Sequence, residues 1–249
     1  MSSRRRKLDA VVASLQVQYG PRAIRRAAAP EMQAPVPRLS TTFPALDAAL
    51  SDSPANTSRG GLPLGRISEI TGPATSGKVT LAAKVVAAAL RENGAIAAWL
   101  DLSRTCDPDY FHRCDVDLER LLVVRPADAG DALAITLYLI ESSALAVLVF
   151  DGAAGDDARA TGLMERLASV VTRTSTAVLF LTEPRASCRA LAHIATIRLG
   201  LTRERWLVQH GDVRGYEGRV TVLKNRLGKE GTAVPIRIIF NGTVRGDGL

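Results

Sequence analysis

A glycine-rich loop that ends in a lysine has the clearest chemical meaning in this sequence. It reads Gly72-Pro-Ala-Thr-Ser-Gly-Lys78 and lies between a stretch typical of a β-strand and one typical of a helix. Glycines let a backbone turn tightly and aim its N–H groups at an anion, and the positive end of the helix adds to the attraction. The loop predicts a nucleotide phosphate site in which the lysine holds the β- and γ-phosphates. The residues expected to contact the nucleotide here are Gly72, Pro73, Ala74, Thr75, Ser76, Gly77, Lys78, Val79 and Thr80.

The residue after the lysine departs from the usual phosphate-loop pattern. A Ser or Thr normally stands there because its hydroxyl ligates Mg²⁺, whereas this chain has Val79. Thr80 follows, but one helix position rotates a side chain by about 100°, so Thr80 should not substitute directly. We therefore expect phosphate binding to survive on the backbone and Lys78, and the Mg²⁺ site to be weakened.

A second acidic element is the segment Ala146-Val-Leu-Val-Phe-Asp151, an apolar stretch that ends in a carboxylate. At the carboxyl end of a parallel strand beside a phosphate loop, an aspartate orients the Mg²⁺ shell. Because Gly152 follows, Asp151 also fits a plain Asp-Gly turn. The phosphate loop favours the metal-binding role.

From Val36 onward the pattern alternates between strand and helix. Continuous apolar strands in such βα units predict a buried parallel sheet, and the strand-rich end of the chain predicts an antiparallel extension. The expected fold class is α/β, with a mostly parallel sheet flanked by helices. The expected strands are 66–71, 96–101, 121–125, 146–151, 177–182, 195–201, 205–209, 219–225 and 234–240, and the expected helices are 78–92, 131–142 and 163–173.

Residues 1–35 differ from the rest, so we expect an N-terminal amphipathic helix with a linker, followed by a nucleotide-binding core over 36–249. Tyr19-Gly20-Pro21 ends the helix, and the stretch 27–37 is rich in Ala and Pro. A helix with so little core of its own needs a partner surface, on this chain or on a neighbouring copy. We therefore interpret 1–35 as an assembly element. Its apolar residues at helical spacing are Leu8, Val11, Val12 and Leu15.

Composition narrows the class of protein. The 249 residues carry a formal net charge of +7, and 47% of them are hydrophobic, which suffices for a large α/β domain. The basic run Arg4-Arg5-Arg6-Lys7 favours a polyanionic partner such as nucleic acid, or is a solvated tail. The three cysteines form no CxxC pair, and no stretch is typical of a signal peptide or a membrane span. We expect a cytoplasmic protein without a membrane partner.

Taken together, these motifs resemble RecA, the bacterial recombinase with a P-loop NTPase core. The resemblance implies that Tyr110 stacks on the adenine with Asp107 nearby, and that Asp151 serves the metal. It also implies that Lys224 and Arg226 reach the nucleotide held by a neighbouring subunit in a filament. Tyr110 also fits a plain core aromatic, and the two basic residues also fit a solvated strand face. The segments that carry the resemblance are 60–78, Asp101, 107–110, 116–118, 190–199 and 219–226, together with the N-terminal helix, its stop at Tyr19-Gly20 and the basic stretch after it.

The departures from RecA concern catalysis and DNA binding. The position of the catalytic glutamate holds Ser103, which is no general base at neutral pH. The polar sensor position holds Glu183, whose charge would repel a γ-phosphate. The stretches that match the two DNA-binding loops are short. The resemblance implies a DNA-dependent ATPase, but with an eroded catalytic set.

The stretch 117–132 is similar to ImuA, a family of RecA-related accessory proteins of mutagenic translesion synthesis. Two functions follow. The first is an ATP-binding, RecA-like protein of recombination, repair and the DNA-damage (SOS) response, with single-stranded DNA, copies of itself or a RecA filament as partners. The second is a non-catalytic accessory module that binds RecA or a translesion polymerase. An ordinary P-loop kinase is a weaker alternative, because no lid-like arginine cluster stands out.

Overall fold

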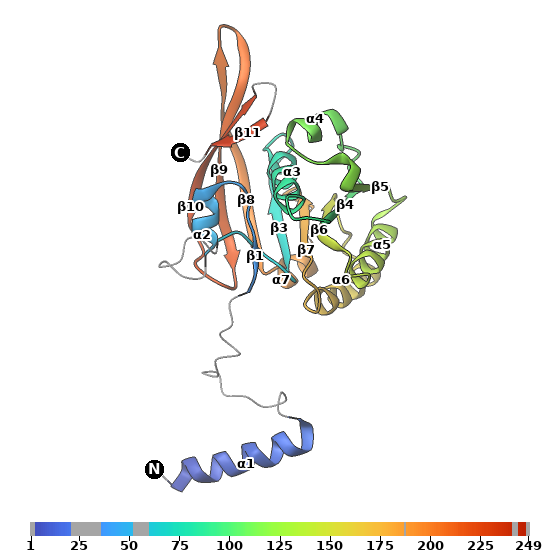
Figure 1. Ribbon diagram of the computed structural model, residues 1–249, viewed down its shortest axis with the longest axis vertical. Coiled ribbons are helices and arrows are strands. Elements are labelled where there is room, and N and C mark those ends of the chain that lie inside the picture. Colours follow the sequence, from blue (N-terminus) through green and yellow to red (C-terminus); the bar gives the residue numbers. More distant parts are fainter. Residues whose placement is uncertain (1–2, 21–35, 52–59, 187, 241–243, 248–249) are drawn as a thin grey trace. The chain divides into compact units, whose positions relative to one another are not determined.

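The computed structural model describes residues 3–20, 36–51, 60–186, 188–240 and 244–247 (Figure 1). The chain divides into two compact units, Met1–Val36 and Pro37–Leu249. In the first unit, helix α1 (Ser3–Tyr19) ends before Gly20, which has a φ of +90° and so adopts the left-handed conformation in which helices commonly stop. Leu8 and Val11 of this helix are exposed. The expected linker falls mostly outside the described residues.

The second unit is built on a mixed sheet with nine strands among the described residues. Six of them run parallel, and three more continue the sheet in antiparallel fashion beyond β8. This arrangement confirms the expected α/β fold class. The parallel strands, in their order across the sheet, are β5 (Leu121–Val124), β4 (Ile96–Asp101), β6 (Leu145–Asp151), β7 (Ala177–Thr182), β3 (Ile67–Thr71) and β8 (Ile197–Gln209). The antiparallel strands are β9 (Asp212–Asn225), β10 (Ala233–Phe240) and β11 (Val244–Asp247), and a separate two-stranded sheet joins β1 (Arg38–Leu39) to β2 (Leu62–Pro63).

Helices cover both faces of the parallel part. Successive residues of a strand point to opposite faces, so in β4 Trp99 joins the core on one face and Leu100 joins the core on the other. On the first face, α3 (Lys78–Ala89) and α4 (Pro108–Arg113) lie over the parallel strands, and α2 (Pro44–Leu50) packs against the antiparallel strands β9 and β10. The second carries α5 (Ala129–Glu141), α6 (Ala158–Val171) and α7 (Arg189–Ile194). Burial on both faces explains the continuous apolar runs of these strands. A 3₁₀ turn, Leu118–Arg120, precedes β5.

The long hairpin of β8 and β9 differs from the sequence-based expectation. The residues expected to form two strands, 195–201 and 205–209, form the single strand β8. The hairpin turns at His210 and Gly211, both with positive φ, and extends past the other strands (Figure 1). Its register shifts between Arg203 and Arg205, where polar residues interrupt the apolar pattern although the pairing continues. Among the described residues, no helix is long and apolar enough to cross a membrane.

Candidate nucleotide-binding site

The loop between β3 and α3 forms the base of the site. All residues of β3 are buried, which anchors the start of the loop. Gly77 directly precedes α3 with a φ of +99°, and a Cβ added there would lie 2.2 Å from the hydroxyl oxygen of Tyr216. A side chain is therefore excluded at this position. Thr75 also has a positive φ, of 60°, and its carbonyl oxygen accepts a hydrogen bond of 2.9 Å from Nη1 of Arg203.

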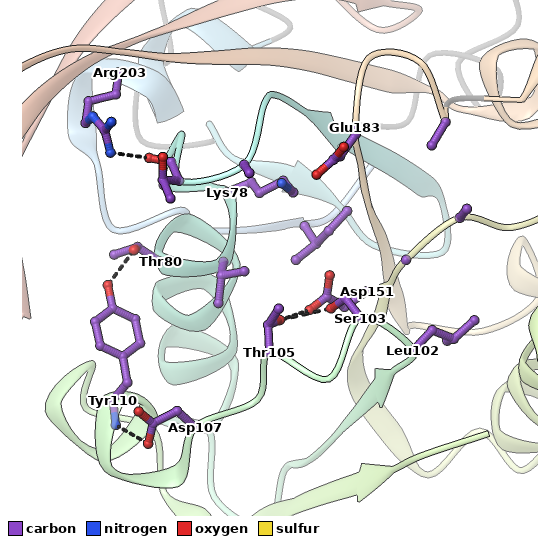
Figure 2. Close-up of a pocket in the computed structure, with 18 of the residues that line it drawn as sticks. Lys78, Thr80, Leu102, Ser103, Thr105, Asp107, Tyr110, Asp151, Glu183 and Arg203 are labelled. Atoms are coloured by element: carbon purple, nitrogen blue, oxygen red, sulfur yellow. Dashed lines mark hydrogen bonds between the residues drawn. The ribbon is translucent and has the colours of Figure 1, made fainter. Parts of the chain in front are cut away.

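A cavity of about 960 Å³ opens beside this loop (Figure 2). It brings together most of the residues that the sequence predicts to contact nucleotide or metal. Gly72, Pro73 and Ser76 belong to the loop but do not line the cavity. The predicted residues on its wall are Ala74, Thr75, Gly77, Lys78, Val79, Thr80, Ser103, Asp107, Tyr110, Asp151 and Glu183.

Lys78 is the charged side chain of the loop. Its Nζ lies 3.3 Å from the carbonyl oxygens of both Gly72 and Pro73, which is long for a hydrogen bond. Figure 2 shows this side chain projecting toward the strand ends that carry Asp151 and Glu183. A phosphate oxygen would offer the ammonium group shorter, charge-assisted hydrogen bonds. The geometry is therefore suited to an anion held between the loop and these strand ends.

Tyr110 lies against the first turn of α3. Its phenol oxygen is 2.5 Å from the hydroxyl oxygen of Thr80, a buried residue. Burial also raises the pKa of Tyr110. The ring is positioned by the N-cap of α4, because Oδ1 of Asp107 accepts hydrogen bonds from the N–H groups of Asp109 (2.9 Å) and Tyr110 (3.2 Å). Asp107 and Tyr110 thus lie together at the start of α4, on the wall of the cavity.

Two carboxylates end the neighbouring strands β4 and β6. Asp101 and Asp151 are register partners, and both are buried. Asp101 accepts hydrogen bonds from the N–H of Thr105 (2.8 Å) and from Nε of Arg125 (3.1 Å). Oδ2 of Asp151 accepts from the hydroxyl of Thr105 over 2.6 Å. Thr105 therefore links the two carboxylates, a role that sequence analysis missed because nothing local in the sequence marks it.

Ser103 and Glu183 occupy the positions that the resemblance assigns to catalysis. Oγ of Ser103 lies 2.9 Å from Oγ1 of Thr105, so it belongs to the same hydrogen-bonded chain. Glu183 follows β7 and is exposed at the cavity. The wall of the cavity therefore holds the hydroxyl of Ser103, within a hydrogen-bonded chain, and the exposed carboxylate of Glu183.

Lys224 and Arg226 lie elsewhere in the same chain. Nζ of Lys224 donates to the carbonyl oxygens of Ala192 (2.8 Å) and His193 (3.0 Å), and the guanidinium of Arg226 also donates to His193. Both basic groups thereby cover the carbonyl end of α7, where positive charge is favourable. Burial, with Arg226 and Arg198 nearby, lowers the pKa of Lys224. Neither residue lines the cavity of its own chain.

An aromatic cluster on the antiparallel strands forms a further wall that sequence analysis did not single out. Trp206 and Tyr216 face each other across β8 and β9 with ring centroids 5.9 Å apart, and Phe240 of β10 lies 5.9 Å from Tyr216. Cζ of Arg203 lies 4.0 Å from the Trp206 ring centroid. Aromatic residues make up 4% of the chain and are spread along it, so no local pattern marks this cluster. The strand register decides that these three rings meet.

Comparison with known proteins agrees with this fold. Residues 6–165 match the family model described as the RecA N-terminal domain, which is more than half of the chain. Protein RecA of Amycolatopsis mediterranei is 34% identical over 251 residues, covering 88% of this chain and 70% of that protein. Protein RecA of Mesorhizobium japonicum is 32% identical over 273 residues, covering 97% of this chain and 71% of that protein. Protein RecA of Arthrobacter sp. is 32% identical over 277 residues, covering 99% of this chain and 75% of that protein. The chain belongs to the RecA family.

Proposed function

We propose that this protein is a RecA-like ATP-binding protein of DNA recombination, repair and the DNA-damage (SOS) response. It would bind ATP and associate with single-stranded DNA or a RecA filament, with weak or absent hydrolysis. The observation that carries the proposal is the shared cavity of Lys78, Tyr110 and Asp151, at the carboxyl ends of parallel strands. Family membership supports nucleotide binding and a role in recombination or repair.

The residues present fit ATP better than they fit Mg²⁺. A phosphate can take the backbone N–H groups at the start of α3 and the ammonium of Lys78. For the metal, the side chain of Val79 has no oxygen, and the Thr80 hydroxyl is engaged with Tyr110. Asp151 remains as the carboxylate that would orient the ion, and it already accepts a hydrogen bond from Thr105. A bound Mg²⁺ would neutralise phosphate charge, and here we expect it to contribute less than in active members of the family.

Weak hydrolysis is expected from two residues on the wall of the cavity, Ser103 and Glu183. Ser103 replaces a general base, and such a loss costs roughly 10²- to 10⁴-fold in rate. Glu183 adds negative charge where the γ-phosphate would lie. We infer that the protein holds ATP for far longer than an active recombinase does.

We propose assembly with RecA-like protomers, either copies of this chain or RecA itself. The net charge of +7 supports a polyanionic partner such as single-stranded DNA. In an assembly, Lys224 and Arg226 would reach the nucleotide of a neighbouring protomer. They would have to exchange the carbonyl oxygens at the end of α7 for phosphate oxygens. Phosphate oxygens carry more charge, so that exchange is favourable once a neighbour is present.

The decisive experiment is a titration of the full chain with labelled ATP, with and without Mg²⁺ and single-stranded DNA. We expect saturable binding, little dependence on Mg²⁺, and tighter binding with DNA if the protein assembles on it. Lys229→Ala serves as a matched control, because this lysine is exposed and lies outside the cavity, whereas Lys78→Ala should weaken binding. The absence of saturable binding to the unaltered chain would refute the proposal.

A second function is favoured by the hydrogen bonds of Asp101 and Asp151. Asp101 accepts from Thr105 and Arg125, and Asp151 accepts from Thr105, so both carboxylates already have partners within the chain, which suits a site that no longer works on its nucleotide. In this case the protein would be an ImuA-like accessory module of translesion synthesis that binds RecA or a polymerase. Co-sedimentation with purified RecA filaments separates the two functions. Binding to filaments without any response to ATP would favour the accessory module.

A further inference from the structure

Tyr216 carries a hydroxyl group whose burial needs an explanation. The residue is 4% exposed, and its hydroxyl makes no hydrogen bond of acceptable geometry among the described residues. The hydroxyl of Thr80 lies close enough to influence the pKa of Tyr216, but its short hydrogen bond, of 2.5 Å, is with Tyr110. A buried polar group without a partner costs roughly 1–3 kcal/mol. Such a cost is commonly found at functional sites, where a ligand supplies the missing partner.

The hydroxyl is aimed at the start of α3. Its oxygen would lie 2.2 Å from a Cβ on Gly77, so the ring packs directly against the backbone that leads into Lys78. Tyr216 lines the same cavity as Lys78 and Thr80. Trp206 and Phe240 contact its ring on either side, which fixes the direction of the hydroxyl.

We propose that Tyr216 is a further nucleotide-contacting residue, whose hydroxyl donates a hydrogen bond to a phosphate oxygen of the bound nucleotide at the first turn of α3. This inference rests on the proposed ATP site and adds to it a contact from strand β9. Trp206 and Phe240 are positioning residues that hold the ring.

An anionic acceptor is the partner that the surroundings favour. The side chain of Lys78, the N-terminal end of α3 and the guanidinium of Arg203 place positive charge around this part of the cavity. Burial raises the pKa of Tyr216 to about 12, so the phenol keeps its proton at neutral pH and donates. A phosphate oxygen accepts from such a donor and gains from the same cations.

The test compares Tyr216→Phe with the unaltered full-length chain by calorimetric titration. The change removes one oxygen atom that has no partner, so the variant should fold with an unchanged or higher melting temperature. Tyr138→Phe is the matched control, because this tyrosine is 76% exposed on α5. Three probes are titrated: ATP, inorganic tripolyphosphate and adenosine. We expect Tyr216→Phe to raise the dissociation constants of ATP and tripolyphosphate about tenfold and to leave that of adenosine unchanged.

The outcomes separate this inference from the ATP site itself. If Lys78→Ala weakens ATP binding while Tyr216→Phe does not, the contact is absent although the ATP site stands. Tighter binding by Tyr216→Phe would overturn the inference as well, because the hydroxyl would then obstruct the phosphates. If adenosine is weakened as strongly as ATP, the ring contacts the base and the proposed phosphate contact is wrong. If the unaltered chain binds none of the probes, the ATP site and the inference both fail.

Discussion

The hydroxyl oxygens of Thr80 and Tyr110 lie 2.5 Å apart, although the two residues are 30 positions apart in the sequence. The hydrogen bond ties the expected adenine-stacking residue to the first turn of the helix that follows the phosphate loop. It also occupies the hydroxyl that stands next to Val79, where a Mg²⁺ ligand is normally found. The pair therefore connects the base end of the proposed site to its phosphate end, and it bears on both ATP binding and metal binding.

Replacing Lys78 with alanine should weaken ATP binding by about tenfold or more. A charge-assisted hydrogen bond of this kind contributes roughly 1.5–3 kcal/mol. Equilibrium titration with labelled ATP measures the change, with Lys229→Ala as the control. An unchanged dissociation constant would show that this loop is no working phosphate site.

The unaltered protein should hydrolyse ATP very slowly, and the pair of changes Val79→Thr and Ser103→Glu should recover some turnover. The first restores a hydroxyl for Mg²⁺, and the second restores a general base on the same cavity wall. Adding Glu183→Gln should raise the rate further, because it removes the repelling charge. Phosphate release measures all three proteins. A rate for the unaltered chain near that of an active, DNA-stimulated recombinase would contradict this interpretation.

Alkaline pH should destabilise the fold through its buried tyrosines. Burial raises the pKa of Tyr216 to about 12, above the usual value near 10 that it has in the unfolded chain. The contribution of the protonated Tyr216 to the free energy of unfolding is therefore fully present below pH 10, and it is lost as the pH rises through 12. A pKa difference of about two units between the folded and the unfolded chain corresponds to at most roughly 3 kcal/mol of unfolding free energy.

Thermal unfolding between pH 9 and pH 12, in steps, measures this dependence. Tyr216→Phe should show a smaller loss of melting temperature over that range than the unaltered chain. Tyr138→Phe should follow the unaltered chain, because Tyr138 is exposed. An equal loss in all three proteins would refute the assignment to Tyr216.

Removing Arg198 should cost about 3–5 kcal/mol of stability. Its guanidinium pairs with Glu69, a fully buried carboxylate in the centre of the sheet whose other oxygen accepts a hydrogen bond of 2.7 Å from Thr182. Arg198→Met would leave this buried charge without its cation. Urea denaturation measures the change, and it should be partly reversed by adding Glu69→Met. Arg166→Met, at an exposed pair with Glu141, should leave stability nearly unchanged.

Deleting residues 1–30 should leave a folded core that no longer associates with RecA-like protomers. Leu8 and Val11 are 59% and 54% exposed, and burying a few aliphatic side chains on a partner would contribute several kcal/mol, roughly 1.5–3 each as an upper figure. Sedimentation of the truncated and full-length proteins, alone and mixed with RecA, tests this role. Equal mass distributions for both proteins would show that the helix is no assembly element.

The sequence alone determined the parallel half of the fold and the strand–loop–helix order around the loop 72–78. The bounds of β4 (Ile96–Asp101) and β7 (Ala177–Thr182) were predicted to the residue, because a strand that is buried on both faces has a continuous run of apolar residues in the sequence. The phosphate-binding role of the loop 72–78 could be predicted because it depends on a local strand–loop–helix order, and the structure has that order. The short helices α2 and α7 were missed, since six or seven residues are too few for a helical period to show. Helix α4 was missed too, although Asp107-Pro108 is a typical helix start.

Only the tertiary structure decided which distant side chains meet in the cavity. Tyr216 reaches Gly77 because the register of β8 and β9 turns its ring toward α3, and a shift of one residue would turn it to the other face. Thr105 reaches Asp151 because β4 and β6 are neighbours in space. A local pattern encodes which face of a strand is buried, but it does not encode which strand lies beside it. The polar and aromatic wall of the site therefore depends on strand order and register, which arise from the packing of the whole sheet.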